Sequence, residues 1–187
     1  MITLITGGSG SGKSAYAEQK VVEFGDLNRI YIATMYPFDE ESHKRIARHR
    51  VMRAKKKFST IECYVGLKNV KIPKHSCVLL ECLSNLTANE MFQENGAKEK
   101  VVEEVLDGVK NLDRQAEQVI IVTNEIFSDG IEYDKETEQY QKYLGEINAK
   151  LAVWAQEITE VVYGIPMHYK KTEKKEGQKN GKIVEQF

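Results

Sequence analysis

The fold of this chain is decided by one stretch, ITLITGGSGSGKS, which spans residues 2–14. It leads from a short apolar run into a match to the phosphate-binding pattern G-x-x-x-x-G-K-[ST], Gly7 to Ser14. Glycines permit positive φ angles and let backbone N–H groups approach phosphate oxygens closely. A Gly/Ser-rich turn can match this pattern by accident, but the strand before it and the helix expected at 15–24 argue against that interpretation. We therefore expect Lys13 to reach the β- and γ-phosphates of a nucleotide and Ser14 to ligate Mg²⁺.

The composition is that of an ordinary globular protein. The 187 residues are 41% hydrophobic and 29% charged, with a formal net charge of −1. This length suits one compact domain, which we expect at 1–169, followed by a charged tail at 170–187. A net charge near zero attracts neither nucleic acid nor an anionic membrane, and no apolar run approaches the roughly 18 residues of a membrane span. We expect neither partner.

The cysteines and the N-terminus bear on the compartment. Cys63, Cys77 and Cys82 are odd in number and form no C-x-x-C pair, so they indicate reduced, buried thiols and neither a disulfide frame nor a zinc site. The chain opens directly on a strand, without a basic leader segment. We expect a cytoplasmic location.

Strand-like and helix-like stretches alternate along the chain. Such alternation predicts right-handed crossovers and a mostly parallel central sheet with helices on both faces, an α/β fold of the P-loop NTPase type. The expected strands are 2–6, 29–34, 59–64 at an edge, 77–82, 118–123 and 160–164, and the expected helices are 15–24, 39–57, 83–93, 98–115 and 133–156.

Ligands of such sheets bind at the carboxyl ends of the strands. Four polar residues stand at these ends beside the phosphate loop: Thr34, Glu81, Asn124 and Glu125. Glu81 closes an apolar strand, and an acid in this position can hold Mg²⁺ directly or through water. A carboxylate that caps the next helix is the alternative.

A basic segment at 45–53 contains a second candidate for chemistry. Arg45, His49 and Arg53 are spaced four residues apart, so on a helix they share one face. A neutral imidazole can attack a phosphoryl group, and guanidinium groups can neutralise phosphates. On this evidence alone, a solvated histidine on a basic helix is the commoner interpretation.

Seven motifs along the chain match one family in that family's own order. They are Ile5–Gly8 with Ser11–Ser14, Tyr31–Thr34, Arg45-Ile46 with His49-Arg50 and Arg53, Thr60–Cys63, Leu79–Leu83, Val122–Glu125, and Gly145 with Asn148 and Leu151-Ala152. The chain therefore resembles the bifunctional adenosylcobinamide kinase / adenosylcobinamide-phosphate guanylyltransferases of cobalamin biosynthesis. The resemblance extends from the first strand to about Pro166.

The resemblance implies a role for each matching residue. It implies that His49 takes GMP from GTP as a covalent guanylyl-histidine, that Lys13 is the second catalytic residue, and that Ser14 and Glu81 are the metal ligands. The nucleotide-binding residues that it implies are Gly7, Gly8, Ser9, Gly10, Ser11, Gly12, Lys13, Ser14, Ala33, Thr34, Met35, Arg50, Val51, Met52, Arg53, Glu62 and Glu81.

The resemblance also implies two reactions, with Mg²⁺ as cofactor and ATP and GTP as substrates. In the first, ATP or GTP phosphorylates the hydroxyl of adenosylcobinamide. In the second, the guanylyl group moves through His49 to adenosylcobinamide phosphate, giving adenosylcobinamide-GDP. We hypothesise that the helix that carries His49 moves toward the phosphate loop when GTP binds. Relatives of this kind imply a homo-oligomer, with a trimer expected.

The sequence departs from the family pattern at three places, and these departures bear on the expected corrinoid substrate more than on the expected nucleotide. Arg53 is followed by Ala54 in place of a proline, the stretch Phe127–Gly130 replaces a Val-Gly segment, and Gln141 stands where the family has an arginine. A P-loop kinase for a small metabolite, without guanylyltransferase activity, remains the alternative. A nucleotide-binding regulatory protein without catalysis is the third possibility. No Asn-Lys-x-Asp segment supports a Ras-like GTPase.

Overall fold

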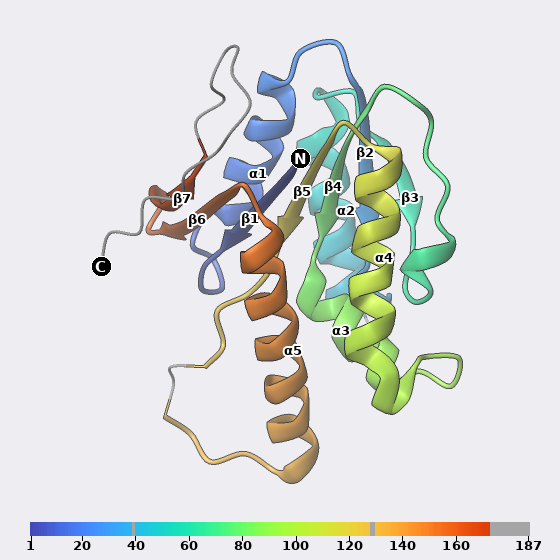
Figure 1. The fold of residues 1–187 in the computed structure, drawn as a ribbon, viewed down its shortest axis with the longest axis vertical. Helices are drawn as coiled ribbons and strands as arrows, with labels where there is room; N and C mark the ends of the chain where they lie inside the picture. The colour runs from blue at the N-terminus through green and yellow to red at the C-terminus, as the bar shows by residue number, and fades with distance from the viewer. Residues whose placement is uncertain (39, 128–129, 173–187) are drawn as a thin grey trace.

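A seven-stranded sheet forms the centre of the molecule in the computed structural model, which describes residues 1–38, 40–127 and 130–172 (Figure 1). Its strands are β1 (Ile2–Thr6), β2 (Asn28–Ala33), β3 (Ser59–Glu62), β4 (Ser76–Glu81), β5 (Gln118–Val122), β6 (Glu157–Val162) and β7 (Ile165–Lys171). The order is β3-β2-β4-β5-β1-β6-β7, with β7 antiparallel to β6 and the other pairings parallel. The predicted α/β class and the edge position of β3 are confirmed.

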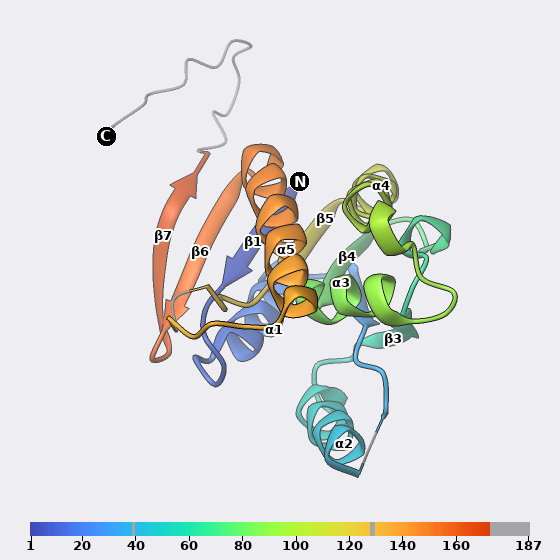
Figure 2. The ribbon, with the colours of Figure 1, turned by 90° about the horizontal axis from the view of Figure 1, so that it is seen from below.

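Helices pack on both faces of this sheet. They are α1 (Lys13–Glu23), α2 (Glu40–Ala54), α3 (Leu83–Phe92), α4 (Val101–Gln115) and α5 (Lys135–Trp154), with short 3-10 turns η1 (Leu67–Asn69) and η2 (Lys98–Lys100). Figure 2 shows α3, α4 and α5 above the sheet and α1 below it. Helix α2 lies on the same side as α1 but projects away from the sheet.

Strand β4 shows why the central strands could be predicted from the sequence. Its residues Cys77 and Leu79 belong to the core layer under α1, and Val78 and Leu80 belong to the layer under α3, α4 and α5. All four side chains are fully buried. A parallel strand covered on both faces needs a continuous apolar run, because neither face meets water.

The C-terminal part differs from the sequence-based expectation. Helix α5 ends at Trp154, β6 begins at Glu157, before the expected 160, and the chain then turns back as β7. The turn has positive φ angles at Tyr163 and Gly164, 50° and 80°, as two-residue hairpin turns require. Nearly every β7 residue is exposed, so no apolar alternation indicated this strand. The first two residues of the expected tail belong to β7, and residues 173–187 lie outside the described part of the chain.

A second difference concerns α4, which begins at Val101 after the 3-10 turn η2 and not at residue 98. None of the helices within residues 1–38, 40–127 and 130–172 combines the length and the apolar character that crossing a membrane requires.

Candidate active site

The loop between β1 and α1 has the geometry of a phosphate-binding loop. At Gly7 φ is 148°, and an added Cβ would lie 2.5 Å from the Val161 carbonyl oxygen, so only glycine fits there. Gly12, with φ 93°, precedes α1 and offers no side-chain cap. The first N–H groups of α1 are therefore left for a ligand, and the positive end of the helix dipole favours an anion.

Lys13 begins α1 and lies against this loop. Its Nζ donates a hydrogen bond to the Gly8 carbonyl oxygen over 2.9 Å, and the residue is 8% exposed. Burial lowers the pKa of Lys13, and its electrostatic interactions with Cys82 and Glu81 act in the opposite direction. A nearly dry ammonium group beside glycine N–H groups is an arrangement for binding phosphate oxygens.

Glu81 ends β4 two strands away from β1. In the sheet register, Glu81 and Ile5 both pair with Val122, so Glu81 lies level with the entry to the loop. Its Oε2 is buried and has no hydrogen-bond partner. An orphaned carboxylate oxygen is costly unless a cation or a donor arrives.

The residues at this position fit Mg²⁺. No cluster of three or more His, Cys, Asp or Glu side chains suited to a metal occurs in the described residues. Mg²⁺ bound with a nucleotide does not need one, because one or two protein oxygens with phosphates and waters complete its shell. The Glu81 carboxylate and the Ser14 hydroxyl, which line the same pocket, are oxygen donors of the required kind.

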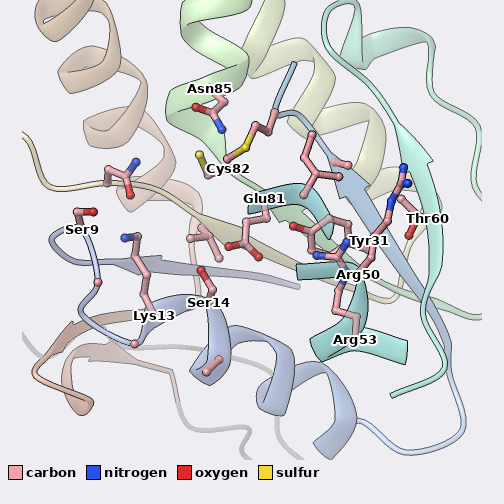
Figure 3. A pocket seen from close by; sticks show the side chains of 18 of the residues that line it. Ser9, Lys13, Ser14, Tyr31, Arg50, Arg53, Thr60, Glu81, Cys82 and Asn85 are labelled. Carbon is pink, nitrogen blue, oxygen red and sulfur yellow. The ribbon is translucent and has the colours of Figure 1, made fainter. Parts of the chain in front are cut away.

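A pocket of about 620 Å³ extends from the loop past Glu81 to α2 and β3 (Figure 3). The pocket connects the phosphate loop, which follows β1, to the carboxyl ends of β2 and β4. Its lining residues are Ser9, Gly10, Ser11, Gly12, Lys13, Ser14, Ala15, Tyr31, Ala33, Met35, Ile46, Arg50, Arg53, Thr60, Glu62, Tyr64, Glu81, Cys82, Asn85, Val122 and Asn124.

Arg53 brings α2 to this pocket. Its guanidinium lies 3.4 Å from the centroid of the Tyr31 ring, and the residue is 5% exposed. A cation over an aromatic face is attracted by the ring. Burial is the largest cause that raises the pKa of Tyr31, so the phenol stays protonated. The Nη1 atom of Arg53 is buried without a hydrogen-bond partner, so it has a free donor for an anion in the pocket.

The rim of the pocket holds an ion pair. Arg50 Nη2 donates to Glu62 Oε1 over 2.8 Å, and the Tyr64 hydroxyl donates to Glu62 Oε2 over 3.0 Å. Both charged side chains of the pair are about half exposed. An ion pair that is this exposed contributes little to the stability of the fold. Its significance is that it places two charged side chains at the rim of the pocket.

Most of the residues predicted for the site line one pocket, and the others lie elsewhere. The predicted residues in the lining are Ser9, Gly10, Ser11, Gly12, Lys13, Ser14, Ala33, Met35, Arg50, Arg53, Glu62 and Glu81. Gly7 and Gly8 form the start of the loop. Thr34 is fully buried, where its hydroxyl donates to the Cys82 carbonyl oxygen, and Val51 is 74% exposed. His49 and Met52 belong to α2, but their side chains, like that of Arg45, lie outside the described residues.

Sequence reasoning missed several lining residues, among them Tyr31, Thr60, Tyr64 and Asn85. Tyr31 and Thr60 lie within strands, before the strand ends at which polar ligand-binding residues are expected. Tyr64 and Asn85 follow strand ends by two and four residues, in the loop and the helix just beyond them. Asn124, which the sequence did place at a strand end, also lines the pocket.

The fold and the loop define the class of protein. The phosphate loop joins a strand to a helix, and an acid, Glu81, ends β4, which is separated from β1 only by β5. This combination defines a P-loop nucleotide-binding α/β protein. The family model described as cobinamide kinase / cobinamide phosphate guanyltransferase matches residues 3–169. This chain belongs to that family.

Curated relatives agree over nearly the whole chain. The bifunctional adenosylcobalamin biosynthesis protein CobU of Escherichia coli K12 is 30% identical, over 91% of this chain and 100% of its own length. The protein of the same name from Salmonella typhimurium is 29% identical over the same shares. Bifunctional adenosylcobalamin biosynthesis protein CobP of Pseudomonas aeruginosa is 29% identical, over 91% of this chain and 98% of its own length.

Among solved structures, the matches include the flagellar accessory protein FlaH of Methanocaldococcus jannaschii. Its TM-score is 0.49 at 11% identity, over 91% of this chain and 78% of that protein. The RadB recombinase matches with a TM-score of 0.46 at 16% identity, over 85% of this chain and 73% of that protein.

Proposed function

We propose that this protein catalyses the two reactions for which its family is named. It phosphorylates the hydroxyl of adenosylcobinamide with ATP or GTP. It then transfers GMP from GTP to adenosylcobinamide phosphate and so forms adenosylcobinamide-GDP. The chain's relatives support this reading through their shared name and near-complete coverage.

One observation in the structure carries the proposal. Within the described residues, three buried side-chain atoms that lack a hydrogen-bond partner line the same pocket: Ser11 Oγ, Arg53 Nη1 and Glu81 Oε2. Buried polar atoms are nearly always paired, and each exception calls for an explanation. A polyphosphate bound with a divalent cation would satisfy all three atoms. The guanidinium of Arg53 and the hydroxyl of Ser11 can donate to phosphate oxygens, and the carboxylate of Glu81 can bind the cation.

In the kinase reaction, the chain's own residues act mainly by position and charge. The loop N–H groups and Lys13 hold the β- and γ-phosphates, so charge that develops on the transferred group meets fixed donors. Mg²⁺, held by Ser14 and Glu81, would neutralise further phosphate charge. The substrate hydroxyl attacks the γ-phosphorus, loses its proton, and the nucleoside diphosphate leaves.

In the transferase reaction, His49 is the proposed nucleophile. A neutral imidazole nitrogen of His49 attacks the α-phosphorus of GTP, the phosphorus–nitrogen bond forms, and pyrophosphate leaves. A phosphate oxygen of adenosylcobinamide phosphate then attacks the same phosphorus, and His49 leaves as the neutral imidazole. The attacking nitrogen must carry a free lone pair, so the step requires the neutral form of the imidazole.

The position of α2 implies that the helix must move before His49 can attack GTP. Helix α2 projects from the sheet (Figure 2), while the phosphate loop lies at the carboxyl end of β1. Arg53, near the end of α2, already lines the pocket. We propose that GTP draws the rest of α2 toward the loop, because its phosphates offer the arginines of the helix a counter-charge.

The finer properties of the protein belong to the same proposal. We propose a cytoplasmic homotrimer with small-molecule partners only, and with neither nucleic acid nor membrane as a partner. The exposed side chains of Tyr163, Ile165, Met167 and Tyr169 on and before β7 offer an apolar sheet edge for contact between subunits. The mass of the protein in solution, measured by light scattering, tests the trimer.

The test of the proposed function uses GTP labelled at the α-phosphate, with Mg²⁺. The wild type is expected to retain label that is labile to acid and stable to alkali, and to pass it to adenosylcobinamide phosphate. His49→Ala is expected to retain none, while His43→Ala, on the same helix, serves as the matched control and labels like the wild type. If a folded wild type that binds GTP retains no label, the transferase assignment fails and a P-loop kinase remains.

A further inference from the structure

Asn124 lines the pocket, but it belongs neither to the phosphate loop nor to the proposed metal site. It follows β5, which lies between β1 and β4 in the sheet. In the register, Val122 of β5 pairs with Ile5 of β1 and with Glu81 of β4. The chain just beyond Val122 therefore passes between the phosphate loop and the carboxylate proposed to hold Mg²⁺.

The backbone on both sides of Asn124 is fixed to β1 and to the phosphate loop. The Thr123 N–H donates to the Ile5 carbonyl oxygen over 2.9 Å. The Glu125 N–H donates to the Gly7 carbonyl oxygen over 3.1 Å. A polar group between two such attachments is preorganised, so it needs no rearrangement when a substrate arrives.

The side-chain amide of Asn124 is held at its nitrogen end. Its Nδ2 donates to Ser84 Oγ over 2.7 Å, and Ser84 Oγ lies 3.1 Å from Cys82 Sγ. Ser84 is buried, and its carbonyl oxygen accepts from the Tyr140 hydroxyl over 3.2 Å, so the partner of the amide is itself fixed. The other end of the amide, Oδ1, makes no hydrogen bond to the described part of the chain. Because Nδ2 is turned to a buried residue, Asn124 presents Oδ1 to the pocket.

We propose that Asn124 Oδ1 accepts a hydrogen bond from the hydroxyl that attacks the γ-phosphorus in the kinase reaction. An amide oxygen only accepts hydrogen bonds. Ionised phosphate oxygens also only accept them, so a bound triphosphate offers Oδ1 no partner. The attacking hydroxyl is a donor that must come close to the γ-phosphate. A hydrogen bond to Oδ1 turns the hydroxyl proton away from the phosphorus and leaves an oxygen lone pair aimed at it.

The contact orients the hydroxyl without removing its proton in advance, because an amide oxygen is a very weak base. The bond from the hydroxyl oxygen to the γ-phosphorus forms, and the bond from that phosphorus to the β–γ bridging oxygen breaks. The nucleoside diphosphate leaves, and the hydroxyl proton passes to a phosphate oxygen of the product or to water. The atoms and charges of the step therefore balance without a further reactant.

Guanylyl transfer needs no such contact. Adenosylcobinamide phosphate attacks through an ionised oxygen, which carries no proton and which Oδ1 repels. The formation of guanylyl-histidine involves no hydroxyl either. Asn124 is therefore a catalytic residue of the first reaction alone, and this separates its role from that of Lys13, which serves both.

The identity of the acceptor hydroxyl rests on the proposed function, so the test compares three readouts of the whole protein. They are phosphorylation of adenosylcobinamide with ATP, hydrolysis of ATP without corrinoid, and retention of the α-phosphate label from GTP. Water presents the same O–H group to Oδ1, so hydrolysis reports on Asn124 without adenosylcobinamide. Asn95→Ala replaces an exposed asparagine and is the matched control.

Asn124→Ala is expected to lower kcat for phosphorylation and for hydrolysis roughly 10²-fold, because the hydroxyl loses its orientation. Nucleotide affinity and the label from GTP should stay within about two-fold of the wild type, because the loop and Lys13 hold the phosphates. Asn124→Asp keeps an accepting oxygen but loses the donor to Ser84. Its kcat should stay within about 10-fold of the wild type, at a raised KM for ATP, because its charge faces the phosphates. Ser84→Ala releases the amide and should lower kcat roughly 3- to 10-fold.

Equal losses of kcat in Asn124→Ala and Asn124→Asp would overturn the inference, since they would leave the bond to Ser84 as the whole role of Asn124. A wild-type kcat in Asn124→Ala, or loss of the α-phosphate label in that variant, would overturn it as well. Circular dichroism shows whether each variant is folded. If Asn124→Ala does not fold, Asn124→Asp decides in its place, because a kcat about 10²-fold below the wild type contradicts an accepting role.

Failure of the proposed function has a different signature. A wild type that hydrolyses ATP, with the expected order of variants, but does not phosphorylate adenosylcobinamide keeps the role of Asn124 and loses the proposed acceptor. A wild type that phosphorylates adenosylcobinamide, with no difference between Asn124→Ala and Asn95→Ala, keeps the function and loses the inference. A folded wild type with neither activity would overturn both.

Discussion

The two ends of the pocket are built differently. The phosphate loop is fixed by the sheet: the Gly7 carbonyl accepts from the Glu125 N–H over 3.1 Å, and the Ser11 carbonyl accepts from the Gly164 N–H over 2.8 Å. Helix α2 projects from the sheet, and Arg53 is its one buried residue among those whose side chains are described. Phosphate recognition is thus preorganised, and the helix that carries the proposed nucleophile is lightly held.

This difference matches the chemistry assigned to each end. Preorganised donors stabilise charge in a transition state because they need not reorient when the charge appears. A lightly held helix can change its position with little loss of packing, as elements that move in catalysis must.

The largest contrast is in stability. Leu80→Ala removes a fully buried side chain of β4, and we expect it to lower the free energy of unfolding by about 2–5 kcal/mol. Ile46→Ala removes a half-buried side chain of α2, and we expect less than about 1 kcal/mol, because little apolar area is lost. Urea unfolding of both variants gives the two values. Equal losses would mean that α2 is packed as firmly as the sheet.

The next effect is on catalysis. Lys13→Ala removes the buried ammonium that we propose holds the phosphates, and we expect both kcat/KM values, for phosphorylation and for guanylyl transfer, to fall about 10²–10³-fold. Lys150→Ala, an exposed lysine of α5 in an ion pair with Glu146, is the control and should leave both unchanged. Loss of only one activity would show that the two reactions use different phosphate sites.

Glycine replacements test the fixed loop itself. Gly7→Ala brings a Cβ against the Val161 carbonyl oxygen at 2.5 Å and the Ser11 hydroxyl at 2.7 Å, whereas a Cβ at Gly8 meets nothing within 4 Å. We expect Gly7→Ala to cost about 1–3 kcal/mol of stability and to weaken nucleotide binding. Gly8→Ala should be close to neutral in thermal unfolding. Comparable melting temperatures for the two variants would contradict the described loop geometry.

The smallest effect is a pH dependence. The proposed role of Lys13 in phosphate binding needs its protonated form, and burial lowers the pKa of Lys13 from the ordinary 10.5. Nucleotide affinity should therefore begin to fall at a pH below 10.5, by up to about 10-fold per pH unit above the lowered pKa. Lys13→Arg, which remains charged, should flatten the profile if it binds at all. The measurement is calorimetric affinity as a function of pH, and a flat wild-type profile would contradict the role of Lys13.

The sequence predicted the loop end better than the α2 end. Residues 2–14 combine a strand, a glycine pattern and a helix start, and all three predict the same structure, so the strand-loop-helix unit could be predicted from the sequence alone. The position of Glu81 near the loop could also be predicted, because the strand ends of a parallel sheet converge. The rim formed by Tyr64 and Glu62 depends on the pairing of β3 with β2 and on the side of the sheet that α2 takes, and no local pattern fixes either.

Strand β7 was missed for a related reason. Its stability comes from pairing with β6 and from the turn at Tyr163 and Gly164, and its side chains face solvent. An alternation of apolar and polar residues in the sequence indicates a strand with one buried face, so this pattern cannot predict a strand that has no buried face. The dipeptide Tyr-Gly was a turn signal, but it stood where the last strand was expected to end.

We propose that a fixed phosphate loop and a mobile α2 act on the same nucleotide. The most direct test is the distance between Val51 on α2 and Gln19 on α1, both exposed, with and without GTP. The probes enter as unnatural amino acids, because Cys82 lines the pocket and could react with thiol reagents. We predict that GTP shortens the distance from Val51 to Gln19 and leaves the control distance from Gln19 to Val153 unchanged. An unchanged distance from Val51 to Gln19 in a protein that retains the α-phosphate label would contradict the account.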